Sequence, residues 1–163
     1  MTPAALVEAA RAAFSRARRA GGRDVDGVLA GRPVRLSFGG DFFAGQLLRA
    51  LAIEQRPASG ATGAQPVPAL RLHAWDLAST GVRLTTDSWA AATLGPSGIV
   101  EGLSDDRYQV SMDVHGALAS LLDRKTGEAY HYVPDPARLP SWETTHPARM
   151  LLAGWARAQG LMT

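Results

Sequence analysis

The sequence predicts an α+β domain in which an antiparallel sheet, made of a hairpin and a C-terminal meander, is packed by about three helices. Three observations support this prediction: apolar residues at helical spacing near both ends of the chain, period-two alternation in several short segments, and turn residues between those segments. The 163 residues suit one domain spanning 1–163. A domain of this size buries roughly 70% of its unfolded surface, so it can fold without disulfides.

The N-terminal part of the chain predicts a helix, a hairpin and a second helix. Thr2 is placed as the cap of the first helix, which ends at Gly21-Gly22. The hairpin turns at Ala30-Gly31-Arg32, and Asp41 is placed as the cap of the second helix. The apolar face of the first helix comprises Leu6, Val7, Ala10, Ala13, Phe14 and Ala17, and that of the second comprises Phe43, Leu47, Leu48 and Leu51.

The middle of the chain begins with a segment rich in Pro and Gly at about 56–68, which predicts a flexible surface loop. We expect no domain boundary there, because strand-like alternation resumes at once over residues 70–75. Residues 77–104 are weakly patterned.

The last third of the chain predicts the meander and a final helix. Alternation over residues 108–113, 117–122 and 129–133, with short turns between them, is typical of three antiparallel strands. Pro147 is placed at the first position of the helix, because proline suits that position. Its apolar face comprises Met150, Leu151, Leu152 and Trp155, and it ends at Gly160.

The composition excludes several classes of protein. The chain has no cysteine, which excludes disulfides, thiolate metal sites and a catalytic thiol. The N-terminus lacks the basic segment and unbroken apolar run of a signal peptide, and no window is apolar enough for a membrane span. We therefore expect a bacterial cytoplasmic protein without a membrane partner.

The charge gives little support for nucleic-acid binding. The formal net charge is only +2, and the arginines are scattered through every predicted element. The one cluster, Arg16, Arg18, Arg19 and Arg23, lies at a predicted helix C-terminus, where cations complement the helix dipole. We expect no nucleic-acid partner.

The sequence shows no complete catalytic site, so it leaves open whether the protein is an enzyme. The four histidines, His73, His115, His131 and His146, have no metal-site spacing, and we expect neither a metal nor another cofactor. The G-x-S-x-G, Walker and Rossmann motifs are all missing. One open alternative is a small enzyme that uses His73 or His131 with Asp76.

The tryptophans allow two interpretations, because aromatic side chains fill cores and also line binding surfaces. Trp155 lies on the apolar face of the last helix, which favours a core position. For Trp75 the alternation leaves core and surface equally open, because the side chain points away from Leu72 and Ala74.

Short motifs are distributed over residues 33 to 161, and they are Trp75-Asp76, Ser79-Thr80-Gly81, Asp106-Arg107-Tyr108, Asp123 with Gly127, Ala129-Tyr130, Pro140 with Trp142-Glu143, and Arg149, Leu151, Leu152, Trp155 and Gly160. Together these motifs resemble the region that precedes the kinase domain in bacterial HPr kinase-like proteins, which occur near genes for modified peptides such as lasso peptides. In that family the final helix leads into a P-loop kinase core. The Walker lysine, magnesium ligands and acceptor-binding residues of that core have no match here, so no family catalytic residue can be carried over.

The resemblance implies a non-catalytic N-terminal accessory domain of a P-loop serine kinase-like protein, which positions a peptide or protein substrate or holds subunits together as a homo-oligomer. We expect an exposed strand edge to take up a peptide by β-augmentation. The expected contact residues are Arg71, Trp75, Asp76, Tyr130 and Tyr132. A stand-alone interaction protein with no kinase domain is the alternative.

Overall fold

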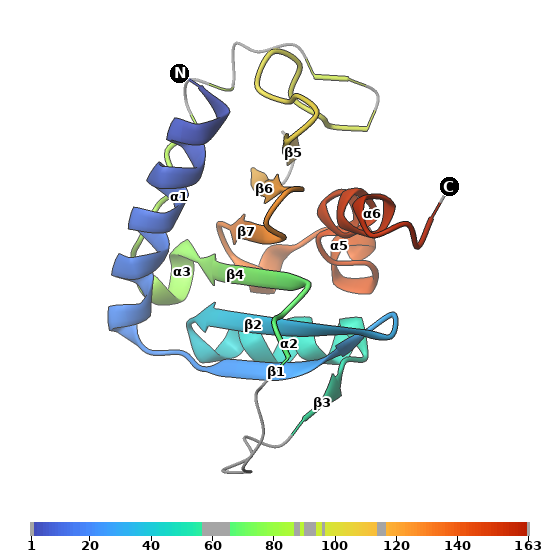
Figure 1. The fold of residues 1–163 in the computed structure, drawn as a ribbon. Coiled ribbons are helices and arrows are strands. Elements are labelled where there is room, and N and C mark those ends of the chain that lie inside the picture. Colours follow the sequence, from blue (N-terminus) through green and yellow to red (C-terminus); the bar gives the residue numbers. More distant parts are fainter. Residues whose placement is uncertain are drawn as a thin grey trace.

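The protein is built around one mixed sheet (Figure 1). The computed structural model describes residues 2–56, 66–86, 89, 94–95, 97–113 and 117–162. Within them, seven strands lie in the order β3-β1-β2-β4-β7-β6-β5. The strands are β1 (Asp24–Leu29), β2 (Arg32–Gly39), β3 (Glu54–Gln55), β4 (Leu70–Asp76), β5 (Tyr108–Asp113), β6 (Leu118–Asp123) and β7 (Glu128–Val133).

The described helices include the three that were expected and two short ones. They are α1 (Pro3–Ala17), α2 (Asp41–Leu51), α3 (Leu77–Thr80), α5 (Ser141–Thr145) and α6 (Arg149–Ala158), with 3-10 turns η1 (Arg18–Ala20) and η2 (Pro136–Arg138). The last helix begins at Arg149, so the placement of Pro147 at its first position is wrong by two residues. Of the expected loop at 56–68, residues 57–65 lie outside the described part of the chain.

The predicted α+β class is confirmed, and so are the hairpin and the meander. Strand β1 pairs antiparallel with β2, and β6 pairs antiparallel with both β5 and β7. The expectation of a purely antiparallel sheet is wrong, because β4 pairs parallel with β2 and with β7. Helix α2 crosses over between β2 and β4, which lets β4 run in the same direction as β2.

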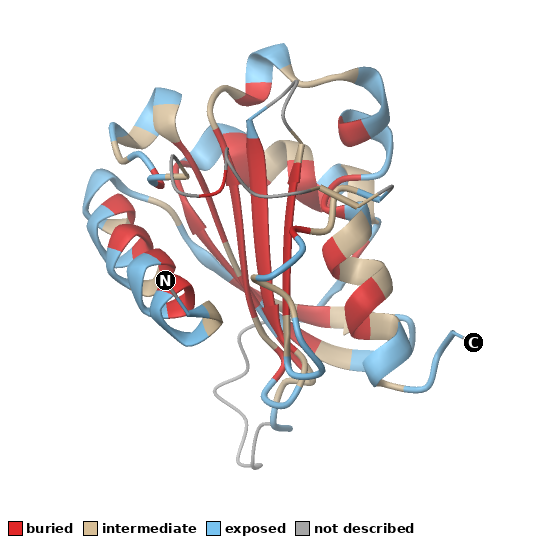
Figure 2. Cartoon of the chain, turned by 90° about the horizontal axis from the view of Figure 1, so that it is seen from above, coloured by how far each residue is buried: buried red, intermediate tan, exposed pale blue. Residues whose placement is uncertain are grey.

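The sheet is covered on both faces, and each face has its own hydrophobic core (Figure 2). Helix α1 packs on one face with the apolar side chains that the sequence predicts, Leu6, Val7, Ala10, Ala13, Phe14 and Ala17. Helices α2 and α6 pack on the other face, against a core that includes Phe38, Leu72 and Trp155. The side-chain alternation along each strand therefore divides residues between a closed α1 face and a face beneath α2, α5 and α6.

Trp75 belongs to the core beneath α1. Its side chain is fully buried, its ring centroid lies 6.0 Å from that of Phe14, and its indole N–H donates to the carbonyl of Val82 over 3.1 Å. The sequence could not decide this position, because the residues that cover Trp75 are distant in the chain.

Replacing Trp75 with alanine should lower the free energy of unfolding by about 3–5 kcal/mol, because it removes a large buried side chain and leaves a cavity. Urea unfolding measures the change. Trp142→Ala is the matched control, because the Trp142 side chain is 47% exposed and its loss should cost less than about 1 kcal/mol. Equal losses in the two variants would contradict the burial of Trp75.

Candidate functional site

The five residues expected to form a contact surface are close together but mostly buried. Arg71 is exposed, whereas Trp75, Asp76, Tyr130 and Tyr132 are each at most 3% exposed. The register places Trp75 beside Tyr132, with ring centroids 5.4 Å apart. As a surface the expected site is therefore wrong, because α1 covers Trp75, Tyr130 and Tyr132, and Asp76 is buried as the cap of α3.

Asp76 has a local structural role. Its carboxylate accepts hydrogen bonds from the backbone N–H of Ser79 over 2.6 Å and from the Ser79 hydroxyl over 2.7 Å. These bonds cap α3, and Gly81 ends that helix with a positive φ of 72°. The Trp75-Asp76 and Ser79-Thr80-Gly81 motifs thus form a tight turn, and Asp76 is not bonded to either histidine of the small-enzyme alternative.

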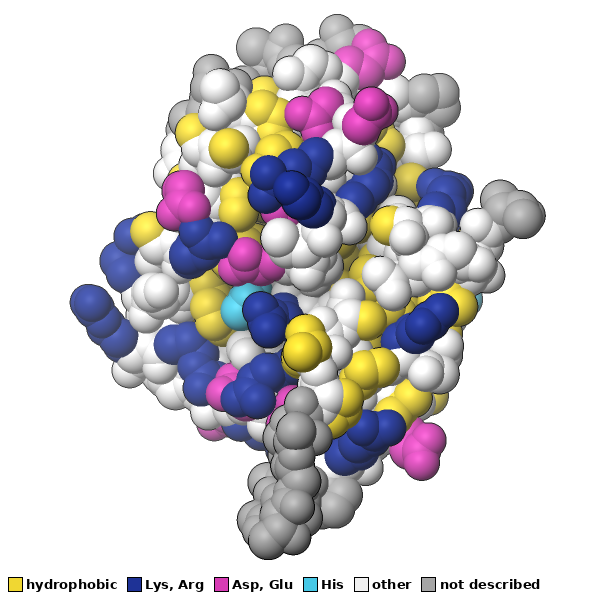
Figure 3. All heavy atoms as spheres, in the orientation of Figure 1, with side chains coloured by type: hydrophobic (Ala, Val, Ile, Leu, Met, Phe, Trp, Pro, Cys, Tyr) yellow, Lys and Arg dark blue, Asp and Glu magenta, His cyan; other side chains and the backbone are white. Residues whose placement is uncertain are grey.

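His73 belongs to a polar cluster at the rim of the α1 face. Its ring stacks on Tyr130 at 4.8 Å, and its Nε2 lies 3.8 Å from the carboxylate of Glu128. That carboxylate also accepts from Arg11 over 2.8 Å and from the Tyr130 hydroxyl over 2.5 Å. Figure 3 shows basic and acidic side chains interspersed across the molecular face of that view.

The ionisation of this cluster follows from burial and hydrogen bonding. Burial lowers the pKa of His73, against the opposing effect of the Glu128 carboxylate. Burial raises the pKa of Glu128, but the hydrogen bonds from Arg11 and Tyr130 outweigh burial and hold the pKa below its usual value. The cluster therefore favours a neutral imidazole beside an ionised carboxylate.

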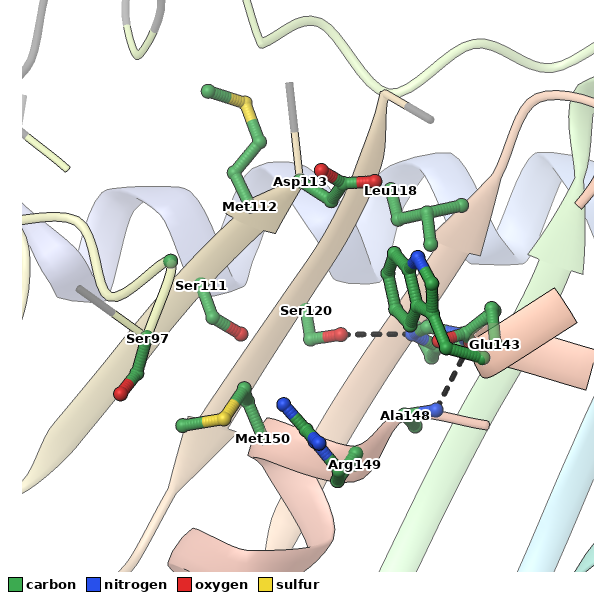
Figure 4. Close-up of a pocket in the computed structure, with 13 residues that line it drawn as sticks. Ser97, Ser111, Met112, Asp113, Leu118, Ser120, Glu143, Ala148, Arg149 and Met150 are labelled. Atoms are coloured by element: carbon green, nitrogen blue, oxygen red, sulfur yellow. Dashed lines mark hydrogen bonds and ion pairs between the residues drawn. The ribbon is translucent and has the colours of Figure 1, made fainter. Parts of the chain in front are cut away.

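A pocket of about 310 Å³ opens on the opposite face of the sheet, between β5–β7 and the segment that carries α5 and α6 (Figure 4). Its polar lining includes Ser111, Ser120, His131 and Glu143. Its apolar lining includes Leu118, Trp142 and Met150, and Arg149 also faces it. The pocket combines apolar walls with a few convergent polar groups, as ligand sites do.

Three neighbouring strands bring the polar groups of this pocket into one row. The register places Ser111 opposite Ser120, and Ser120 opposite His131. The Ser120 hydroxyl lies 2.7 Å from Nδ1 of His131, and Nε2 of His131 lies 2.8 Å from Oε1 of Glu143. The result is a continuous Ser-His-Glu hydrogen-bond chain, whose three residues are at most 7% exposed.

The backbone of the α5–α6 connection fixes the direction of this chain. Oε1 of Glu143 also accepts from the backbone N–H of Ala148 over 2.9 Å, so the carboxylate acts as an acceptor. A neutral His131 then donates to Glu143 from Nε2 and accepts the Ser120 hydroxyl hydrogen at Nδ1. The hydroxyl hydrogen of Ser120 is used in this bond, the lone pairs of its oxygen are not, and the pocket lies beside that oxygen.

Close packing of α6 on β5 holds the rim of the pocket. A Cβ at Gly154 would collide with the side-chain carbonyl oxygen of Gln109, so glycine permits the close approach of the helix. The Gln109 amide donates to the carbonyl of Met150 over 2.7 Å. This bond anchors the first turn of α6 beside the serines.

From the sequence, His131 was considered as a catalytic residue, Glu143 was named only as part of a resemblance motif, and Ser120 was missed. The available signal was positional: the alternation places Ser120 between Leu118 and Leu122, and His131 between Ala129 and Val133, all on one face of the sheet. Polar residues in such rows must find partners. The partner Glu143 could not be identified, because it comes from a short helix that no pattern predicts.

No family model, curated protein or solved structure matches this chain. No helix in the described residues is long and apolar enough to cross a membrane. Among the same residues, no group of three or more His, Asp or Glu side chains is arranged to hold a metal ion.

The depressed pKa of His73 gives a testable dependence of stability on pH. The unfolded chain binds a proton near the ordinary pKa of 6.5, and the folded chain binds it only at lower pH, so stability contributed by neutral His73 is lost as pH falls below that value. His73→Phe keeps an aromatic ring against Tyr130 and removes this titration. Urea unfolding at pH 7 and pH 5 should show a smaller loss in the variant than in the wild type. An equal or larger loss would contradict the assignment.

Proposed function

We propose that this chain is a cytoplasmic accessory domain of an HPr kinase-like protein, and that the pocket between β5–β7 and α5–α6 holds part of a peptide or protein substrate. The observation that supports this most is the placement of the resemblance motifs. Trp142, Glu143 and Arg149 all line the pocket. Asp76, Asp123 and Gly127, by contrast, serve turns and hydrogen bonds of the fold.

The form of the pocket suits a side chain or chain end of a bound polypeptide. Trp142 presents a large aromatic surface at the rim, 47% exposed, and Met150 and Leu118 add apolar wall. Half-exposed aromatic residues beside a pocket are typical anchors of protein and peptide contacts. The inward-facing hydroxyls of Ser111 and Ser120 supply polar groups that fix orientation.

Strand edges offer less for peptide binding than we expected from the sequence. At the β5 edge, the backbone N–H of Met112 donates to Gly98 over 2.8 Å, and the N–H of Val100 donates to Val110 over 2.8 Å. At the other edge, β3 is only two residues long. A pocket contact therefore accounts for peptide binding better than β-augmentation does.

The stand-alone interaction protein remains the alternative, and it would use the same pocket. Reading the encoding gene past codon 163 separates the two. A following strand and a G-x-x-x-x-G-K-[ST] motif support the accessory domain. A stop codon removes the kinase context and leaves the stand-alone alternative.

The probe is a synthetic peptide with the sequence of a modified-peptide precursor encoded beside the gene of this chain, as the family resemblance implies. Trp142→Ala should weaken its binding by at least about tenfold, because the substitution removes an aromatic anchor at the pocket rim. Fluorescence anisotropy of the labelled peptide, titrated with the full chain, measures the dissociation constant.

Phe42→Ala is the matched control for this titration, because Phe42 is a 61% exposed aromatic residue on α2 and does not line the pocket. It should leave the affinity unchanged. If the two variants bind equally well, or if Phe42→Ala weakens binding more, the pocket is not the binding site.

A further inference from the structure

The Ser120 hydroxyl stands at the open end of the buried hydrogen-bond chain. Behind it, His131 and Glu143 are only 1% and 2% exposed, whereas the Ser120 oxygen borders the pocket. Serine hydroxyls are weak nucleophiles unless a base removes their proton. His131 supplies that base at 2.7 Å, within the reach that proton transfer requires.

The orientation of His131 is fixed from the far side of the ring. Glu143 accepts from Nε2 over 2.8 Å, and its oxygen is itself held by the N–H of Ala148. Ala148 has a positive φ of 52°, so the carboxylate holds a backbone conformation that alanine rarely adopts. A nucleophile, a base and a group that orients the base are recognised by such geometry and not by their order in the chain.

Groups that could stabilise a developing negative charge lie at the same pocket. The first turn of α6 faces the pocket at Arg149 and Met150. Because these residues lie in the first turn, their backbone N–H groups have no hydrogen-bond acceptor within the helix. Arg149 adds its side chain, and Ser111, 6% exposed on the neighbouring strand, adds a hydroxyl. Donors of this kind stabilise the oxyanion of an acyl-transfer reaction.

We propose that Ser120 is the nucleophile of an acyl-transfer site that takes a small carboxylic ester, with His131 as the general base and Glu143 as the positioning residue. This activity uses the pocket assigned above to substrate binding, but it goes beyond that assignment and does not need a peptide to occupy the pocket.

The reaction begins when Oγ of Ser120 forms a bond to the ester carbonyl carbon, the carbonyl π electrons move to its oxygen, and the hydroxyl proton passes to Nδ1 of His131. Collapse of the tetrahedral intermediate breaks the bond to the alcohol oxygen, which takes the proton from Nδ1. Water then attacks the acyl-serine with His131 as base, which releases the carboxylic acid and restores Ser120.

An alkyl fluorophosphonate tests the nucleophile directly, because attack by a serine oxygen forms a stable P–O bond with loss of fluoride and a proton. The folded wild-type chain should gain one phosphonyl group, seen by intact mass and located at Ser120 by peptide mapping. Ser120→Ala should lose this label. His131→Asn should slow labelling at least about 100-fold, the contribution of a general base.

Ser15→Ala is the matched control, because Ser15 is an exposed serine of α1, which packs on the opposite face of the sheet, and it does not line the pocket. It should be labelled at the wild-type rate. Labelling that is absent, located at another serine, or equally fast in His131→Asn or in urea-unfolded protein would overturn the proposal. A wild type that binds the precursor peptide but takes no label would overturn the acyl-transfer site and leave the binding function in place.

Discussion

A buried carboxylate must be paired, and in this protein the pairing of Glu143 determines the shape of the pocket. An unpaired charge in such a position would cost several kcal/mol. Glu143 avoids this by accepting from His131 and from the backbone of Ala148, so one side chain joins β7 to the start of α6. Ser120 completes the chain on β6. The sheet, α5 and α6 therefore meet at one hydrogen-bonded junction, and the pocket lies beside it.

The side chains alternate along the strands between two faces of the sheet, and the two faces have different roles. Beneath α1, Trp75, Tyr130 and Tyr132 pack into a closed aromatic core with a polar cluster at its rim. On the other face, the row from His131 to Ser111 interrupts the apolar core, and the covering helices leave room above it. The first arrangement stabilises the domain. The second supplies the groups that can recognise a ligand.

Much of this fold could be predicted because its signals are local. The apolar face of α1, the turn between β1 and β2 and the three strands of the meander all follow from spacing and turn residues. The parallel pairing of β4 could not be predicted, because a strand pattern does not specify its neighbours. The burial of Trp75 depends on which face of the sheet α1 covers, and the pairing of His131 with Glu143 depends on how α5 packs. Both are long-range outcomes of packing, and they determine the candidate site.

The chemistry of the site depends on the direction of the hydrogen-bond chain, because an acceptor at Nδ1 makes the Ser120 hydroxyl a donor to His131 and leaves the Ser120 oxygen facing the pocket. Long-range ¹H–¹⁵N correlation NMR on ¹⁵N-histidine-labelled protein reads the tautomer of each imidazole directly. We expect the proton of the His131 ring on Nε2 and a hydrogen-bonded acceptor at Nδ1. A proton on Nδ1, or a ring that exchanges between tautomers as in solvent, would contradict this expectation.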